Sequence, residues 1–220
     1  MIRWLFLVNL FLAGCASPAA DLLPREVCPE PVGTRQAVDQ HWLNGAEVWR
    51  LRQSVLITIG GRKIPLEGFM VLDLAREQIR LVAMNELGVV LFELLVTDDS
   101  EQLLRAVPPL RQQPGLAQGI AGSLRRIYQQ PRPRQLDKQE QRRSGLRLWR
   151  TTGDEHVDFV FDCTGHLRQT VMTSELLRWQ VFYHSYRPVD GEDVPEHIVL
   201  KDYGRGVTLN IRLQEATRQP

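Results

Sequence analysis

The chain has 220 residues, and its 27 Lys and Arg residues nearly balance its 26 Asp and Glu residues, for a formal net charge of +1. This length suits one domain of moderate size behind a short leader. The balance of charge argues against a nucleic-acid partner, since such a partner requires a basic excess on the protein.

The N-terminal segment has a basic start, a short apolar run and small residues before a cysteine. Arg3 precedes the apolar run from Trp4 to Ala13. The run is too short to span a membrane, which takes about 20 apolar residues, and it is typical of a secretory signal. The tetrad Leu12-Ala13-Gly14-Cys15 resembles the lipobox of bacterial lipoproteins. The alternative is an ordinary cleavable signal in which a cysteine happens to follow Ala-Gly.

The lipobox resemblance implies a role for Cys15. In bacterial lipoproteins the chain is cut before this cysteine, its thiol carries diacylglycerol and the new amine is acylated. We therefore expect residues 1–14 to be a signal peptide and Cys15 to be a lipid anchor, held by about 0.8 kcal/mol per buried methylene. Ala16 and Ser17 follow the cysteine in place of an aspartate. The resemblance thus implies the outer membrane of a Gram-negative bacterium, on the periplasmic face.

Residues 15–36 are predicted to form a tether, and residues 37–220 a single domain. The segment 16–36 contains four prolines and no apolar periodicity. Export to the periplasm favours disulfides, and the two remaining cysteines permit one internal pairing, Cys28 with Cys163. The alternative is two free buried thiols, because the sequence does not show whether the Cα atoms approach within about 7 Å.

Ten segments alternate between apolar and polar residues or run apolar, and turns containing Gly, Asn or Asp separate most of them. In the first, Trp49, Leu51 and Val55 fall on one side and Arg50 on the other. Pro65 indicates an edge or bend near the start of the second. The predicted strands are 48–59, 64–74, 79–84, 89–96, 147–151, 157–162, 166–173, 178–185, 197–202 and 207–213.

The middle of the chain interrupts this pattern. Asp99 or Ser100 can cap a short helix that runs through Arg105 and ends before Pro108-Pro109. Apolar residues at helical spacing then predict a helix over 115–129, in which Gly119 and Gly122 permit close packing. The basic segment 129–143 is rich in Gln and Pro and lacks interleaved aromatics, which favours a solvated linker.

About ten antiparallel strands with a helical interruption predict a mainly β fold of the α+β class. We expect one strongly curved sheet that forms an unclosed barrel covered by a few helices. The main alternative is a closed all-β barrel.

Two stretches carry a family resemblance. Arg80-Leu81-Val82-Ala83-Met84-Asn85-Glu86-Leu87-Gly88, followed by an alternating strand, resembles the strand, Leu-Gly turn and strand of LolB. Val194-Pro195-Glu196-His197-Ile198-Val199-Leu200, followed by a Gly-bearing turn and a strand, resembles the carboxy-terminal hairpin of the LolA/LolB fold. The layout from Trp49 onward is most similar to the outer-membrane lipoproteins encoded in aryl-polyene biosynthesis clusters. Similarity of this kind specifies fold better than function.

The resemblance implies a concave apolar face that holds acyl chains under a helical lid. It also implies that Leu87, like the exposed loop leucine of LolB, helps transfer cargo to the membrane. The alternative is a turn leucine folded back onto the sheet edge. Glu86 places a charge beside this leucine, and no residue clearly matches the arginine with which LolA controls its opening.

Apolar strand residues expected on the concave face would line the lipid cavity. The alternative is that they form a dry core, because periodicity gives the face and not the volume. The predicted lining is Val55, Ile57, Ile59, Leu81, Leu94, Val157, Phe159, Val171, Trp179, Val181, Leu209 and Ile211.

No catalytic or metal-binding motif stands out. The five histidines lack metal-ligand spacing, and a thiol site at Asp162-Cys163-x-x-His166 would need a free thiolate. We expect no enzyme activity, metal or cofactor, and propose from the sequence a carrier of an acyl chain, a polyene lipid or lipoprotein acyl chains, with a periplasmic LolA-like carrier as partner. The alternative is a scaffold module of an envelope biosynthesis or export complex that holds no ligand.

Overall fold

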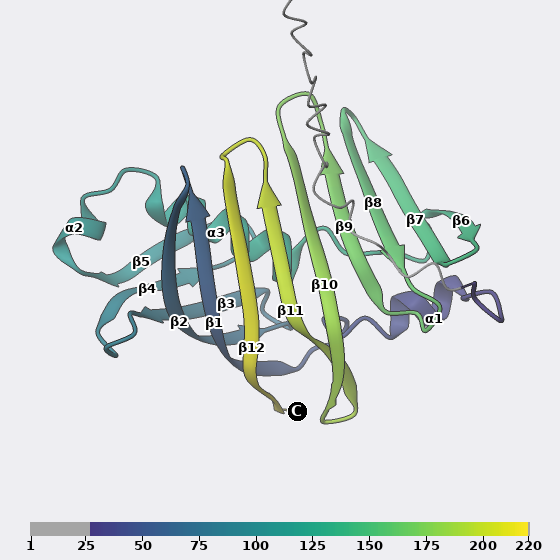
Figure 1. The fold of residues 1–220 in the computed structure, drawn as a ribbon, viewed down its shortest axis with the longest axis horizontal. Helices are drawn as coiled ribbons and strands as arrows, with labels where there is room; N and C mark the ends of the chain where they lie inside the picture. The colour runs from purple at the N-terminus through teal and green to yellow at the C-terminus, as the bar shows by residue number, and fades with distance from the viewer. Residues whose placement is uncertain (1–26, 220) are drawn as a thin grey trace, which may run out of the picture.

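The computed structural model describes residues 27–219, which form a twelve-stranded antiparallel sheet (Figure 1). Cys15, the expected signal peptide and most of the expected tether lie outside these residues. The strands are β1 (Val48–Ile59), β2 (Arg62–Asp73), β3 (Gln78–Met84), β4 (Val90–Val96), β5 (Glu101–Ala106), β6 (Lys138–Arg142), β7 (Gly145–Thr152), β8 (Glu155–Phe161), β9 (Leu167–Thr173), β10 (Arg178–Val189), β11 (Glu192–Asp202) and β12 (Val207–Gln219). The helical segments are α1 (Thr34–Asp39), α2 (Pro108–Arg111), α3 (Leu116–Leu124) and the π-helix η1 (Arg125–Gln129).

The sheet is open, because β5 and β6 form its two edges and do not pair with each other. β1 and β12 pair at its centre over their whole matched length, from Val48 with Gln219 to Ile59 with Val207. The ribbon is strongly curved, and β2 to β5 turn behind β1 (Figure 1). The predicted curved, unclosed sheet covered by helices is therefore confirmed, and the closed-barrel alternative is wrong.

The period-two pattern of β1 sets the concave face. Trp49 and Leu51 point inward and are 0% and 3% exposed, and their partners on β2 are Leu72 and Met70. Directly opposed residues of an antiparallel pair share a face, so the apolar surface continues across the sheet. The pairing of β1 with β12 contains a bulge at Arg52/Gln53, which increases the local twist.

Two predicted elements are wrong, and each error concealed a strand. The segment expected as a helix from residue 99 is the edge strand β5. The backbone N–H of Thr97 donates to the carbonyl of Ser100, so Asp98 and Asp99 form a hairpin turn rather than a helix cap. β6 lies in the expected linker, and its five residues are all exposed, so it lacks the apolar alternation that would identify a strand.

The helix predicted over 115–129 is confirmed as α3 continued by η1. Leu124, Ile127 and Tyr128 are buried, at 5%, 3% and 0% exposure, and belong to the main core. The pair crosses the concave side of the sheet (Figure 1). A π-helical turn offsets side chains from the α-helical spacing and often occurs at functional sites.

A disulfide joins Cys28 to Cys163, with 5.1 Å between their Cα atoms. The pairing expected from the sequence is thus present in the structure. Cys163 lies in the β8–β9 turn, and the backbone N–H of Cys28 donates to the carbonyl of Arg143 in the β6–β7 turn, at 2.7 Å. α1 follows and begins at Thr34, within the last residues of the expected tether, while Val32 already packs in the core.

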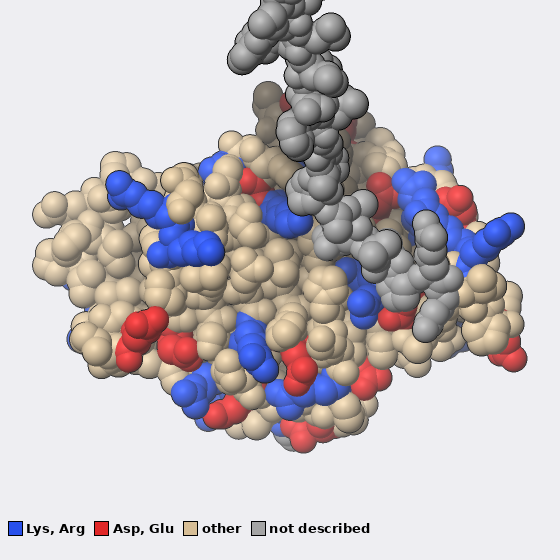
Figure 2. Space-filling view, viewed as in Figure 1, with Lys and Arg blue, Asp and Glu red and all other residues tan. Residues whose placement is uncertain are grey.

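Basic and acidic side chains are interspersed on the face of the molecule shown in Figure 2. Ion pairs also join neighbouring strands, such as Arg52 of β1 with Glu215 of β12 at 3.0 Å. Within residues 27–219, no helix has the length and apolar character needed to cross a membrane.

Candidate functional site

An apolar cavity of about 600 Å³ lies between α3 and the central strands β1, β2, β3 and β12. Its sheet wall includes Val55, Ile57 and Leu209, and its helical wall includes Leu116 and Ile120. The wall residues named here are only partly buried, although they point inward. α3 therefore covers this part of the sheet without filling the space beneath it.

Half of the predicted cavity residues line this space. On β1, β3 and β12 these are Val55, Ile57, Ile59, Leu81, Leu209 and Ile211. Together with β2 these strands form the consecutive run β3-β2-β1-β12 at the centre of the sheet.

The other predicted cavity residues lie elsewhere. Leu94, Val157, Phe159, Trp179 and Val181 are 0–5% exposed and belong to the packed core. Val171 lies on the opposite face of the sheet, because its neighbours Thr170 and Met172 are both buried on the inward face. A register shift between β8 and β9 moves the inward positions of β9 by one residue. The position expected for Val171 is thus corrected.

The inward residues of β7–β11 belong to the same packed core as the N-terminal segment, and the chain that follows η1 bonds to β7. Trp42, in the segment after α1, contacts Trp49 and Tyr128 edge to face, at centroid distances of 5.6 and 6.2 Å. Arg150 of β7 donates to the carbonyl of Arg132 at 3.0 Å and pairs with Asp137 at 2.9 Å. The choice between a cavity and a dry core is therefore resolved locally: the β7–β11 half is core, and the half under α3 is open.

The cavity opens at the rim where β1 turns into β2. Ile59 and Ile64 are 45% and 43% exposed there, which is unusual for inward-facing isoleucines. Arg205, in the β11–β12 turn, also lines the cavity and is the basic residue of this lining. An apolar entrance beside a guanidinium suits an amphiphile with an anionic or polar head.

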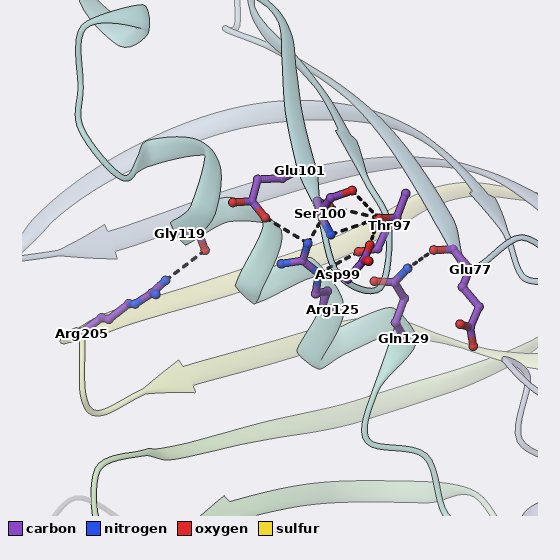
Figure 3. A network of polar contacts seen from close by, with 9 residues as sticks. All are labelled: Glu77, Thr97, Asp99, Ser100, Glu101, Gly119, Arg125, Gln129 and Arg205. Atoms are coloured by element: carbon purple, nitrogen blue, oxygen red, sulfur yellow. Dashed lines mark hydrogen bonds and ion pairs between the residues drawn. The ribbon is translucent and has the colours of Figure 1, made fainter.

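η1 is firmly attached to the sheet, as Figure 3 shows for its first and last residues. The Arg125 guanidinium donates to the carbonyls of Thr97 and Ser100, at 2.8 and 2.6 Å, and pairs with Glu101 at 3.0 Å. Gln129 donates its side-chain amide to the carbonyl of Glu77. These bonds hold the C-terminal end of the cover on the β4–β5 and β2–β3 turns.

The next residue of η1 forms an enclosed ion pair. Arg126 pairs with Asp202, and the two side chains are 14% and 4% exposed, respectively. The Arg126 guanidinium also lies 5.6 Å from the ring centroid of Trp179. Asp202 also accepts the backbone N–H of Arg205 at 3.1 Å. This pair joins the cover to the end of β11.

The N-terminal half of the cover is held more lightly. Arg205 donates to the carbonyl of Gly119 at 3.4 Å (Figure 3). A Cβ atom at Gly119 or Gly122 would lie 3.5 or 3.7 Å from that guanidinium, which is an ordinary van der Waals contact. Arg205 therefore lies against this face of the helix, and the packing there would also accommodate alanine. Sequence reasoning missed Arg205 itself, since a turn arginine carries no pattern.

The β3–β4 turn presents Leu87 to solvent at 87% exposure. The Asn85 side-chain oxygen accepts the backbone N–H groups of Leu87 and Val89, at 3.0 and 2.9 Å, and Gly88 has a positive φ of 76°. The turn is therefore held in shape by its own hydrogen bonds while the leucine points outward. This removes the alternative in which Leu87 folds back onto the sheet.

The cavity lining also includes the acidic residues Glu67 and Asp202, and a hydrogen bond between two neutral side chains lies beside it. Burial raises the pKa of the Tyr128 hydroxyl, so this group stays protonated and donates to the Gln53 side chain at 2.9 Å. The thiol of Cys163 is consumed by the disulfide. Among the residues the structure describes, no three His, Cys, Asp or Glu side chains are grouped so that they could hold a metal ion.

Comparison with known proteins gives structural neighbours only. No family model matches the chain, and no curated protein matches its sequence. A putative outer-membrane lipoprotein-sorting protein domain from Vibrio parahaemolyticus aligns over 85% of this chain and 92% of its own, with a TM-score of 0.53 and 7% identity. At that identity the likeness shows the fold alone.

Two further solved structures align at lower TM-scores. A LolA superfamily protein from Nitrosomonas europaea covers 85% of this chain and 92% of its own, at 10% identity and a TM-score of 0.47. A DUF1329 family protein from Desulfovibrio piger covers 84% and 90%, at 9% identity and a TM-score of 0.38. The fold shared with the Vibrio parahaemolyticus lipoprotein-sorting domain agrees with the fold that the sequence resemblance implies.

Proposed function

We propose that the protein is a non-enzymatic carrier that binds an acyl or polyene chain in the cavity under α3 and hands it on at the outer membrane. The observation that carries this proposal is the row of inward-facing, half-exposed apolar residues, Val55, Ile57 and Leu209, in a space of about 600 Å³. Apolar side chains in a small domain otherwise pack to the density of a crystal. A concave apolar space with few polar groups is the usual form of a ligand site.

Handover requires that cargo bound in the cavity can also leave it. Each methylene buried in the bilayer contributes about 0.8 kcal/mol, and burial against the cavity wall contributes a similar amount per unit area. The apolar chain of the cargo therefore has comparable free energies in the cavity and in the bilayer. The direction of transfer then depends on where cargo is delivered to the protein and where it is removed. The cover fits this use, because α3 is held near the mouth by one 3.4 Å hydrogen bond while η1 is anchored by several.

The position at the membrane rests on the sequence. We propose that residues 1–14 are removed, that Cys15 carries the acyl anchor and that the residues after it form the tether of a single domain. A LolA-like periplasmic carrier would deliver the cargo. The chemistry of an aryl-polyene lipid, a long rigid apolar chain, suits a cavity of this form, and the resemblance to lipoproteins of such gene clusters supports that cargo.

We further propose that Leu87 inserts into the bilayer during transfer. Its 87% exposure on a hydrogen-bonded turn supports this role, since burial of a leucine side chain in an apolar phase contributes about 2 kcal/mol. Leu87→Glu should leave cargo binding intact and slow delivery to vesicles. Val89→Glu, on an exposed residue of the same turn, is the matched control. Equal delivery by the wild type and Leu87→Glu would remove this role.

The test of the carrier function is native mass spectrometry with lipid extraction on the Cys15→Ala protein expressed in the periplasm. A co-purifying lipid should be lost in Ile57→Glu, which places a charge on the cavity wall, and kept in Leu56→Glu, one residue away on the other face of β1. Val181→Glu is unsuitable, since Val181 is 0% exposed and lies in the packed core. A folded protein without lipid that also takes up no fluorescent fatty acid would overturn the proposal in favour of the scaffold module.

A further inference from the structure

The lining at the inner end of the cavity includes two polar residues, Gln53 and Glu67, of which Glu67 accepts the hydroxyl of Ser54 at 2.8 Å. Gln53 points inward from β1 among apolar residues and is 2% exposed. We propose that this amide binds a neutral oxygen atom at the far end of the ligand's apolar chain, so that the cargo is an amphiphile with a second polar group opposite its head. This inference rests on the carrier function proposed above and names the class of its ligand.

The neighbouring strand makes room for the Gln53 side chain. Gly68, its partner on β2, also lines the cavity. A Cβ atom at Gly68 would lie 3.1 Å from Cγ and 3.2 Å from Nε2 of Gln53. The Gln53 side chain therefore lies against this glycine at the cavity wall, and a larger residue at 68 would require it to shift.

Tyr128 fixes which end of the amide faces the ligand. Its hydroxyl, fully buried in η1, donates to Oε1 of Gln53 at 2.9 Å. Because this hydroxyl stays protonated, its hydrogen needs an acceptor, and only the oxygen of the amide can supply one. The NH₂ group is consequently the end left toward the cavity.

Within residues 27–219 the hydrogen bonds of the Gln53 side chain include no acceptor for that NH₂ group, and the group is not among the enclosed polar atoms that lack a partner, as expected for an atom open to the cavity. A methyl group placed against it would leave a buried donor unpaired, at a cost of about 1–3 kcal/mol. An oxygen of the ligand would satisfy it. The NH₂ group of Gln53 lies on the cavity wall at the end away from the mouth, beside Leu81 and Gly68.

The surroundings favour an uncharged oxygen at this end. The lining near Gln53 is apolar apart from Glu67, whose Oε2 has no partner, so an ionised carboxylate of the ligand would meet an acidic neighbour in place of a cation, which would be expensive. The basic residue of the lining is Arg205, at the mouth, next to the Ile59–Val207 pair. Gln53 is six residues from Ile59 along β1, which at about 3.3 Å per residue places it about 20 Å inside. An anionic head at Arg205 and a neutral oxygen at Gln53 would thus sit at opposite ends of one extended chain.

The experiment compares two probes of the same length, hexadecanoic acid and ω-hydroxyhexadecanoic acid, by calorimetric titration of delipidated Cys15→Ala protein. We expect the wild type to bind the ω-hydroxy acid about tenfold more tightly. The double variant Gln53→Leu/Tyr128→Phe removes both hydrogen-bond partners, which limits its cost to the fold. It should bind hexadecanoic acid more tightly than the ω-hydroxy acid. Leu209→Ala, on the wall nearer the mouth, is the control and should weaken both probes without changing their ratio.

The outcomes separate this inference from the carrier function. A wild type that prefers the methyl-terminated acid would overturn the inference and leave the carrier function standing. Equal loss of both probes in the double variant would place the acid head at Gln53 and would also overturn it. Failure of the wild type to bind either probe would count against the carrier function itself. Thermal unfolding of each variant identifies any loss that comes from misfolding.

Discussion

Leu94 and Leu209 were expected to line the same concave face, and they now offer a direct test of where the cavity lies. Leu94 of β4 is 0% exposed in the packed core, whereas Leu209 of β12 is only partly buried on the cavity wall. Truncation of a buried leucine to alanine costs about 2–5 kcal/mol, because the lost burial is joined by the cost of a new cavity. We expect this range for Leu94→Ala.

Leu209→Ala should cost about 1 kcal/mol. Only part of the side chain is removed from water by folding, so about half of the 1.5–3 kcal/mol for full burial is at stake. The variant also enlarges an existing space and does not create one. The measurement is urea unfolding of delipidated protein with the disulfide intact, followed by circular dichroism. Equal losses for the two variants would mean that the space under α3 is packed, and would refute both the cavity and the proposed function.

Three further predictions concern the fold that carries the cavity. Cys28→Ser/Cys163→Ser should lower the free energy of unfolding by up to about 5 kcal/mol, since the bond closes a loop with a sequence separation of 135; an unchanged urea midpoint would contradict this. Burial, and secondarily the charge of Arg132, lowers the pKa of His41 from 6.5 to about 3. As the pH falls, His41 takes up a proton in the unfolded chain before it does so in the folded protein. The free energy of unfolding should therefore decrease from pH 6.5 toward pH 3, by about 2 kcal/mol at pH 5. His41→Gln should flatten the profile of urea midpoint against pH, and an unaltered slope would refute the assignment. Arg126→Met leaves Asp202 enclosed without its cation and should cost about 3–5 kcal/mol; Arg126→Met/Asp202→Asn should recover part of this loss in thermal unfolding, and no recovery would mean that the arginine acts only by packing.

The sequence predicts the sheet well because apolar alternation is a local signal. Ten of the twelve strands are predicted from this alternation. The other two, β5 and β6, do not have it. β6 is exposed on every residue, and Leu103 and Leu104 give β5 an apolar pair that fits a helix as well as an edge strand. Asp98-Asp99 is likewise compatible with a helix cap and with a hairpin turn.

The extent of the cavity does not follow from alternation. Ile57 and Val181 have the same pattern, and they differ only in what packs against them. Trp42 packs against Trp49 of β1 and Tyr128 of η1, and the segment after η1 bonds to β7 through Arg150. Neither Trp42 nor this segment carries a periodic signal. Gln53 is the exception, since a polar residue at an inward position of β1 is visible in the sequence and marks the inner end of the site.

The disulfide also sets how far the cavity can travel from the membrane. Cys163 lies in the β8–β9 turn, at the end of the sheet away from the mouth, where β1 meets β2. On the proposed anchoring at Cys15, thirteen residues separate the bilayer from this fixed point, a reach of about 45 Å when extended. β1, with its twelve residues, is about 40 Å long. The mouth can therefore turn down to the bilayer or outward to a delivering partner, and stays within about 85 Å of the surface in either case. Such confinement raises the local concentration of membrane around the mouth. Reduction of the disulfide would let the mouth move farther from the bilayer and would lower that local concentration.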